Sequence, residues 1–148
     1  MLRPVQQLDT RFLRDMLRHA YHWRLAQDAE LPVYRYLRNW GRRGDAGVVA
    51  FQGRNVYGAA WYRLFKSDEP GFAFVDETTP ELTIAVVPGR RGRGTGGELL
   101  EALLARARAD GYAQVSLSAP DGQTRFYEKH GFRVVSRDDD TVTMVASL

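Results

Sequence analysis

The sequence predicts one α/β domain over residues 1–148, in which antiparallel hairpins flank a single parallel β-α-β crossover. Three observations predict this class. The chain has the length of one domain. Its apolar residues recur at helical spacing in some segments and form short strand-like runs in others. One such run is followed by a glycine-rich loop, an amphipathic helix and another strand, an order that places two strands parallel with a right-handed connection.

The composition is that of an ordinary globular protein, with 44% hydrophobic and 26% charged residues. The chain has no cysteine, which excludes disulfides, thiolate zinc sites and a cysteine nucleophile, and we predict no metal site. The net charge of +3 is modest, so we expect neither a nucleic acid nor a membrane as partner. The first residues contain no long apolar run, so we expect a cytoplasmic protein.

Two helices are predicted after a short extended start. The first has Asp9 or Thr10 as its N-cap, and the second begins near Pro32 and ends at Gly41. The apolar face of the first helix consists of Phe12, Leu13, Met16, Leu17 and Ala20. That of the second consists of Val33, Tyr36, Leu37 and Trp40.

The middle of the chain predicts an antiparallel hairpin, a loop and a buried strand. Strands over residues 48–51 and 56–65 are joined by a short turn. Residues 66–80 are rich in turn formers and form a loop. The β-branched run over residues 81–87 then stops at Pro88, as expected of a buried strand.

The last third predicts the crossover helix, its second strand and a C-terminal hairpin. Leucines at helical spacing mark a helix over residues 97–110, and a strand over 112–118 follows. A short helix covers 123–130. Strands over 132–135 and 141–147 then form the hairpin.

The stretch "PGRRGRGTGGELL", residues 88–100, predicts a phosphate site between the strand and the crossover helix. The first N–H groups of a helix lack internal partners and carry the positive end of its dipole. Glycines let a phosphate approach the main chain, and arginines add charge. A plain turn with solvated arginines is the alternative, but such a turn needs only one or two glycines.

Two nucleotide motifs fit this loop poorly. Gly92, Gly94 and Gly97 satisfy the dinucleotide pattern G-x-G-x-x-G, yet that site needs an acidic residue at the end of the next strand. The nearest one here is Asp121, already in the following loop. A nucleoside triphosphate loop needs a lysine after its last glycine, where this chain has Glu98.

The loop resembles the R/Q-x-x-G-x-G/A motif of the GCN5-related N-acetyltransferase (GNAT) family. The resemblance implies acetyl-CoA as cosubstrate, with its pyrophosphate on the loop and its pantetheine arm between splayed strands. It also implies an N-terminal meander and helices on both faces of the sheet. Main-chain groups of Val86 and Val87 are expected to hold the pantetheine. The residues that match the motif are Arg91, Gly92, Arg93, Gly94, Thr95 and Gly96.

A second segment, "RFYEKHGF" at residues 125–132, resembles another frequent feature of that family. The resemblance implies that Tyr127 protonates the leaving thiolate of CoA or hydrogen-bonds its sulfur. Alternatively, Tyr127 packs on the helix with its hydroxyl in water. The family often has an asparagine after the fifth strand; here Ser118 or Gln123 is expected to replace it. Glu81 is the candidate base, acting through water, unless it is a solvated residue at a strand end.

We therefore expect direct transfer of an acetyl group from acetyl-CoA to an amine, with a catalytically degenerate acyl-CoA sensor as the alternative. The acceptor stays open between a small amine, a peptide N-terminus and a lysine. Residues 20–30 and the acidic loop 67–81 are expected to border the acceptor site. A homodimer is also left open.

Overall fold

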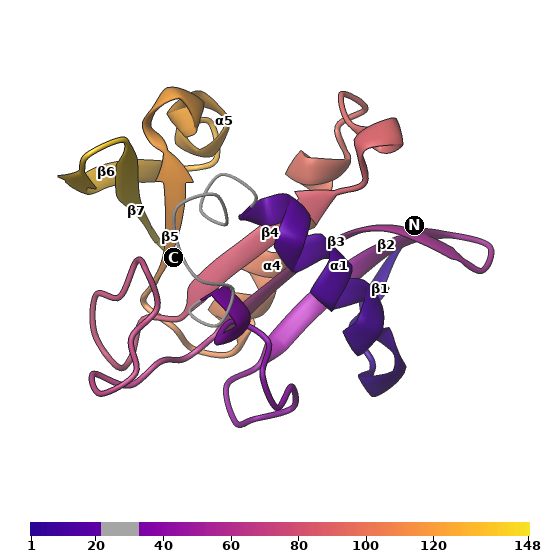
Figure 1. The fold of residues 1–148 in the computed structure, drawn as a ribbon, viewed down its shortest axis with the longest axis horizontal. Helices are drawn as coiled ribbons and strands as arrows, with labels where there is room; N and C mark the ends of the chain where they lie inside the picture. The colour runs from indigo at the N-terminus through magenta and orange to yellow at the C-terminus, as the bar shows by residue number, and fades with distance from the viewer. Residues whose placement is uncertain (22–32) are drawn as a thin grey trace.

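The computed structural model describes residues 1–21 and 33–148. Its centre is a seven-stranded mixed sheet with the order β1-β2-β3-β4-β5-β7-β6 (Figure 1). The β4–β5 pair is parallel and the other pairs are antiparallel, which confirms the predicted class. The strands are Leu2–Pro4 (β1), Ala46–Gln52 (β2), Asn55–Arg63 (β3), Glu81–Val86 (β4), Gln114–Pro120 (β5), Phe132–Asp138 (β6) and Thr141–Ser147 (β7).

Helices cover both faces of this sheet, as expected. The three α-helices with assigned bounds are Thr10–Ala20 (α1), Thr95–Ala109 (α4) and Thr124–Glu128 (α5). Successive residues of a strand point to opposite faces. Accordingly, Ala59 and Trp61 of β3 join the buried cluster of α1, whereas Ala60 and Tyr62 join that of α4. In the described ranges, no helix combines the length and the apolar character needed to cross a bilayer.

Both elements that follow β4 in the crossover begin two residues away from the predicted position. Helix α4 begins at Thr95 because its N-cap, Gly94, has a left-handed backbone with φ 81°. That conformation turns the chain into the helix earlier than the leucine pattern indicates. Strand β5 begins at Gln114, two residues later than predicted, and runs on to Pro120.

The second predicted helix ends earlier in the structure than predicted. Its start at Pro32 lies outside the described residues, residues 33–34 are helical, and turns follow to residue 41. Arg63, which is 1% exposed, lies against this segment and forms an ion pair with Asp45 at 2.9 Å. The Arg63 guanidinium also donates to the main-chain carbonyls of Arg35, Leu37 and Arg38. A buried cation therefore satisfies carbonyls that a longer helix would have paired internally.

Candidate active site

Strands β4 and β5 diverge and leave a gap in the sheet. Within these two strands, pairing occurs only between Glu81 and Ser116. The Ser116 N–H donates to the Pro80 carbonyl at 3.0 Å, and the Val87 N–H donates to the Tyr57 carbonyl of β3 at 2.9 Å. Since main-chain groups alternate in direction along a strand, those of Leu82, Ile84 and Val86 turn toward β5. The gap thus presents an open strand edge, as the family resemblance implies.

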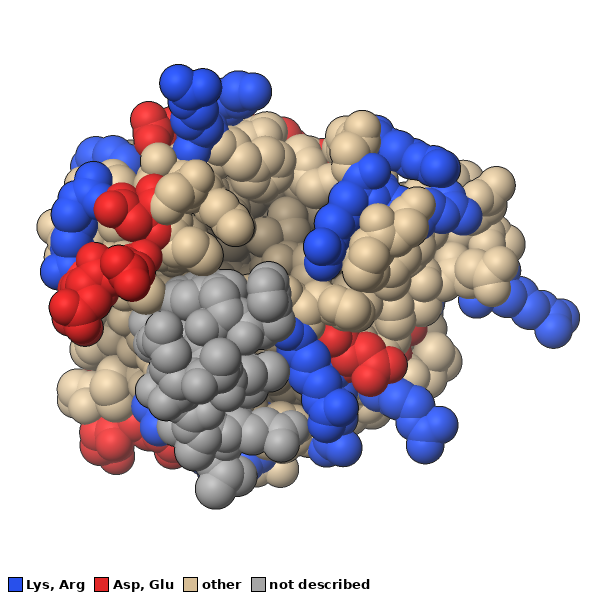
Figure 2. Space-filling view, turned by 45° about the horizontal axis from the view of Figure 1, so that its top comes forward, with Lys and Arg blue, Asp and Glu red and all other residues tan. Residues whose placement is uncertain are grey.

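A small cavity of about 20 Å³ lies in this gap, enough for about one water molecule. Helix α5 contributes Tyr127 to its lining. The other lining residues are Ala20, Tyr21, Leu82, Thr83, Ile84, Leu117 and Ser118. Figure 2 brings this side of the molecule forward and shows a hollow bordered by uncharged side chains, with blue cationic side chains nearby.

Tyr127 is suited to donate a proton in this gap. Its half-buried ring makes edge contacts with Phe126 and Phe132, at centroid distances of 5.1 and 5.9 Å. Burial raises the pKa of Tyr127 to about 12, so the phenol keeps its proton at neutral pH. Both sequence interpretations, a phenol that serves the CoA sulfur and a hydroxyl in water, stay predictions.

The glycine loop and α4 together form a cradle for an anion. Gly92 and Gly94 have positive φ angles of 79° and 81°, and a Cβ atom at either position would meet nothing within 4 Å. The open space and the N-terminus of a long helix fit a phosphate group. Arg91 and Arg93 are exposed at the loop, and Arg91 Nε donates to the Val86 carbonyl at 3.1 Å. The loop therefore touches the last gap-facing residue of β4.

Other residues of the same stretch have structural partners. Arg90 donates to Gln52 at 3.0 Å and lies 4.4 Å from the centroid of the Tyr57 ring, so it binds the β2–β3 hairpin. Cβ atoms built at Gly96 and Gly97 would lie 3.4 Å from Phe126 and 3.5 Å from His130. These two glycines allow α5 to approach α4. The spacing of Phe126 and His130, four residues apart, is the sequence signal for this contact.

The two valines expected to hold the pantetheine arm differ in the structure. Both main-chain groups of Val87 have partners, because its N–H donates to Tyr57 and its carbonyl accepts from the Arg90 N–H at 2.9 Å. The main chain of Val86 turns toward the gap, where its carbonyl accepts from the Arg91 side chain at 3.1 Å. The geometry therefore favours Val86 over Val87 for this role, which stays a prediction for both.

Glu81 is buried rather than solvated, being 1% exposed at the start of β4. The Tyr36 hydroxyl donates to Glu81 Oε2 at 2.6 Å. The loop of residues 66–80 passes directly above, since a Cβ atom at Gly71 would lie 1.8 Å from the same oxygen. Phe72 N–H donates to the Tyr36 hydroxyl at 2.7 Å. The surface interpretation of Glu81 is wrong, and its partner Tyr36 was not predicted as a site residue.

Two acidic residues of that loop are engaged within the loop itself, and Glu69 pairs with Arg38 outside it. The Asp76 carboxylate accepts from Thr78 at 2.9 Å, and the Glu77 carboxylate accepts from the Ser67 N–H at 2.8 Å. Hydrogen bonds from the Thr79 and Thr78 hydroxyls lower the pKa of Asp76, and the Ser67 N–H lowers that of Glu77. These carboxylates order the loop near Glu81. The other predicted border of the acceptor site is residues 20–30. Of these, residues 22–30 lie outside the described part of the chain.

Ser118 is the better placed substitute for the family asparagine. Ser118 lines the gap cavity together with Tyr127, whereas Gln123 is exposed.

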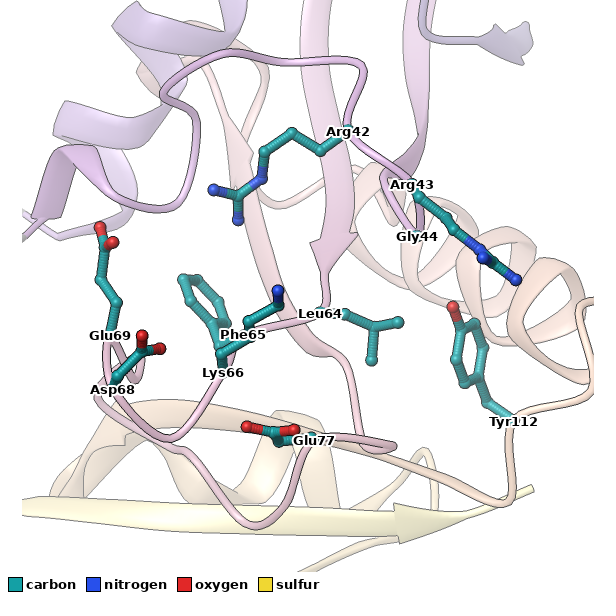
Figure 3. A pocket seen from close by; sticks show the side chains of 10 residues that line it. All are labelled: Arg42, Arg43, Gly44, Leu64, Phe65, Lys66, Asp68, Glu69, Glu77 and Tyr112. Atoms are coloured by element: carbon teal, nitrogen blue, oxygen red, sulfur yellow. The ribbon is translucent and has the colours of Figure 1, made fainter.

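A second, larger cavity of about 690 Å³ shares no lining residue with the gap. It lies where β3 ends and β5 begins, and Figure 3 shows the Arg43 guanidinium near the hydroxyl of Tyr112. Its charged lining is balanced between three cations and three acids, so it favours no ligand of one sign. The charged side chains are Arg42, Arg43, Lys66, Asp68, Glu69 and Glu77.

Comparison with known proteins identifies the class. The family model described as an acetyltransferase (GNAT) domain matches residues 43–134, more than half of the chain. The protein therefore belongs to the GNAT acetyltransferase family, which confirms the resemblance drawn from the two motifs. A search of the curated proteins found no match.

Solved structures with the same fold include several acetyltransferases. A ribosomal-protein-alanine N-acetyltransferase from Brucella melitensis has a TM-score of 0.74 at 21% identity, covering 100% of this chain and 99% of that one. A putative acetyltransferase from Salmonella typhimurium, solved with acetyl-CoA, has a TM-score of 0.74 at 18% identity, covering 100% and 93%. A GNAT acetyltransferase from Elizabethkingia anophelis with acetyl-CoA bound has a TM-score of 0.70 at 19% identity, covering 100% and 97%.

Proposed function

We propose that the protein is a cytoplasmic N-acetyltransferase that moves the acetyl group of acetyl-CoA directly to an amine. The observation that carries this proposal is the position of Tyr127. Its protonated phenol borders the gap between β4 and β5. The anion cradle lies where β4 leads into α4. Membership of the GNAT family and the acetyl-CoA bound to two structural neighbours support the same reaction.

The loop and the open edge of β4 divide the binding of acetyl-CoA between them. The main chain at Gly92 and Gly94, with Arg91 and Arg93, would hold the pyrophosphate. The main chain of Val86 would hold the pantetheine arm in the manner of an added strand. The acetyl thioester would then lie in the gap beside Tyr127.

Residues at and behind the gap would then donate and accept the protons of the transfer. The amine nitrogen forms a bond to the thioester carbonyl carbon, and the carbon–sulfur bond breaks. Tyr127 gives its phenolic proton to the departing sulfur. An ammonium acceptor loses two protons as it becomes an amide. One goes to Glu81, and the other replaces the proton that Tyr127 has given up.

A thiol-release assay with acetyl-CoA and a panel of amines tests this proposal. The panel contains small amines, peptides with free N-termini and peptides with lysine. Replacing Tyr127 by Phe should lower kcat by about 10²-fold or more, the usual contribution of a general acid, with little change in acetyl-CoA affinity. Tyr112→Phe, outside the gap, is the matched control and should retain wild-type kcat.

Two outcomes would contradict the proposal. If Tyr127→Phe retains kcat within twofold, the phenol is not the acid. If the wild-type protein binds acetyl-CoA but releases no thiol with any amine, the chain is an acyl-CoA sensor instead.

The cofactor site has its own test in the affinity for acetyl-CoA, measured by calorimetry. Arg91→Ala should weaken binding about tenfold or more, because a hydrogen bond to a charged group contributes about 1.5–3 kcal/mol. Arg90→Ala serves as the control and should have a smaller effect, since Arg90 is held by Gln52 and Tyr57. Equal affinities of wild type and an Arg91→Ala/Gly94→Asp double variant would refute the assignment of the loop.

A further inference from the structure

Four polar side chains are buried together beside and behind the gap, and binding of acetyl-CoA does not account for them. Tyr21 follows α1, Tyr36 belongs to the turn segment after it, and Glu81 and Thr83 lie on β4. They are between 1% and 3% exposed. Buried polar groups are costly unless they are paired with one another, so this cluster needs an explanation.

The cluster connects the cavity to the candidate base. Tyr21 and Thr83 line the cavity that also contains Tyr127, whereas Tyr36 and Glu81 lie behind them and are not part of its lining. The Tyr21 and Tyr36 rings stack at 5.1 Å with an angle of 29°. The Tyr36 hydroxyl in turn donates to Glu81 Oε2 at 2.6 Å. The order from the cavity inward is therefore Tyr21, Tyr36 and Glu81.

Burial keeps the two phenols of this cluster protonated. Burial is the main cause that raises the pKa of Tyr21, and the charges of Glu81 and Tyr127 act in the same direction. The neighbouring Thr83 and Tyr36 side chains oppose that rise. Burial also raises the pKa of Tyr36, with Tyr21 and Glu81 contributing. Both phenols stay neutral, so each can accept a proton at its oxygen while donating its own.

We propose that Tyr21 and Tyr36 form a proton relay from the acceptor amine in the gap to the buried carboxylate of Glu81. The inference rests on the proposed acetyltransferase function and names the residues that deprotonate its substrate. Tyr21 receives a proton from the ammonium nitrogen and passes its own to the Tyr36 oxygen. Tyr36 passes its proton to Glu81 Oε2. One N–H bond breaks, one O–H bond forms on Glu81, and both tyrosines end neutral.

The relay resolves a conflict in the position of Glu81. Glu81 is the predicted base, yet Gly71 and Tyr36 cover its carboxylate, and its side chain does not line the cavity. A base that is closed off from its substrate can act only through intermediate groups. Water was the intermediate predicted from the sequence, but the cavity itself holds about one water molecule, and two ordered hydroxyls lie between the cavity and Glu81.

The pH dependence of Tyr21→Phe and Tyr36→Phe tests the relay. The assay measures kcat/KM for thiol release between pH 6.5 and 10, with the amine that the wild-type protein acetylates fastest. At pH 7, where an alkyl amine is mostly protonated, each variant should lose about 10²-fold in kcat/KM. The loss should shrink at least tenfold toward pH 10, because the amine then arrives already neutral. Tyr127→Phe should show no such recovery.

The same measurements separate this role from a structural one. A purely structural defect lowers kcat/KM by the same factor at every pH, and that result would overturn the relay. So would wild-type activity in both variants at pH 7. Acetyl-CoA affinity and the melting temperature serve as controls for folding, and Tyr36→Phe decides the question if Tyr21→Phe does not fold. A wild-type protein that releases no thiol with any amine would instead refute the proposed function.

Discussion

The buried ion pair of Arg63 and Asp45 should be a major determinant of stability. Their side chains are 1% and 2% exposed, and Arg63 Nε and Nη2 both donate to the Asp45 carboxylate at 2.9 Å. Arg63 also donates to the carbonyls of Arg35 and Arg38 at 3.0 and 2.6 Å. Replacing Arg63 by Met leaves a buried carboxylate without its cation and three carbonyls without this donor. Breaking such a pair costs about 3–5 kcal/mol.

Thermal unfolding checks this magnitude. For a domain of this size, 1 kcal/mol corresponds to about 2–4 °C, so Arg63→Met should lower Tm by roughly 6–20 °C. Asp45→Asn added to Arg63→Met should recover part of the loss, because it removes the unpaired charge. Arg106→Ala removes an exposed pair with Asp110 and should change stability by less than about 1 kcal/mol. Equal Tm values for Arg63→Met and Arg106→Ala would refute the argument.

Two further predictions concern acid stability and the glycine loop. The hydrogen bonds from Arg3 lower the pKa of Asp9 below its ordinary 3.8, so its ionised form stabilises the fold above that pH and the benefit is lost as the pH falls further. The Tm difference between wild type and Asp9→Asn should therefore shrink between pH 5 and pH 3. Gly94→Ala places a side chain at φ 81° and should cost about 1–2 kcal/mol in thermal unfolding. Gly89→Ala, in open space without a positive φ, should cost less.

Local sequence patterns were sufficient for most of the sheet and for the cofactor loop. The leucine spacing of α4 and the glycines before it depend on short-range rules, and both appear where predicted. The position of β7 between β5 and β6 follows from the same kind of rule. Its buried Val142, Met144 and Ala146 make it more apolar than β6, which carries charges along the sheet edge. An apolar strand is stable inside a sheet, and a charged one at its edge.

The environment of Glu81 depends on contacts that local patterns do not contain. Its burial requires Tyr36, 45 residues earlier in the chain, and a close approach of the backbone at Gly71. Neither contact leaves a periodic signal. The early end of the second helix has the same origin, because the carbonyls that follow it are satisfied by Arg63, a residue of β3. Local propensity predicted a helix that continues to Gly41, but tertiary contacts end it earlier.

The chemistry of the gap also favours direct transfer over an acetylated enzyme. A serine or threonine nucleophile needs an adjacent base to activate it. The described residues that line the gap cavity offer hydroxyls at Ser118 and Thr83 but include no histidine, and the whole chain contains no cysteine. The titratable groups at this place are instead phenols, with Tyr127 on the α5 side and Tyr21 on the α1 side. Phenols that burial keeps protonated move protons better than they attack a thioester. The proposed donor for the thiolate and the proposed acceptor for the amine proton thus line the same cavity, which is what a single-step transfer requires.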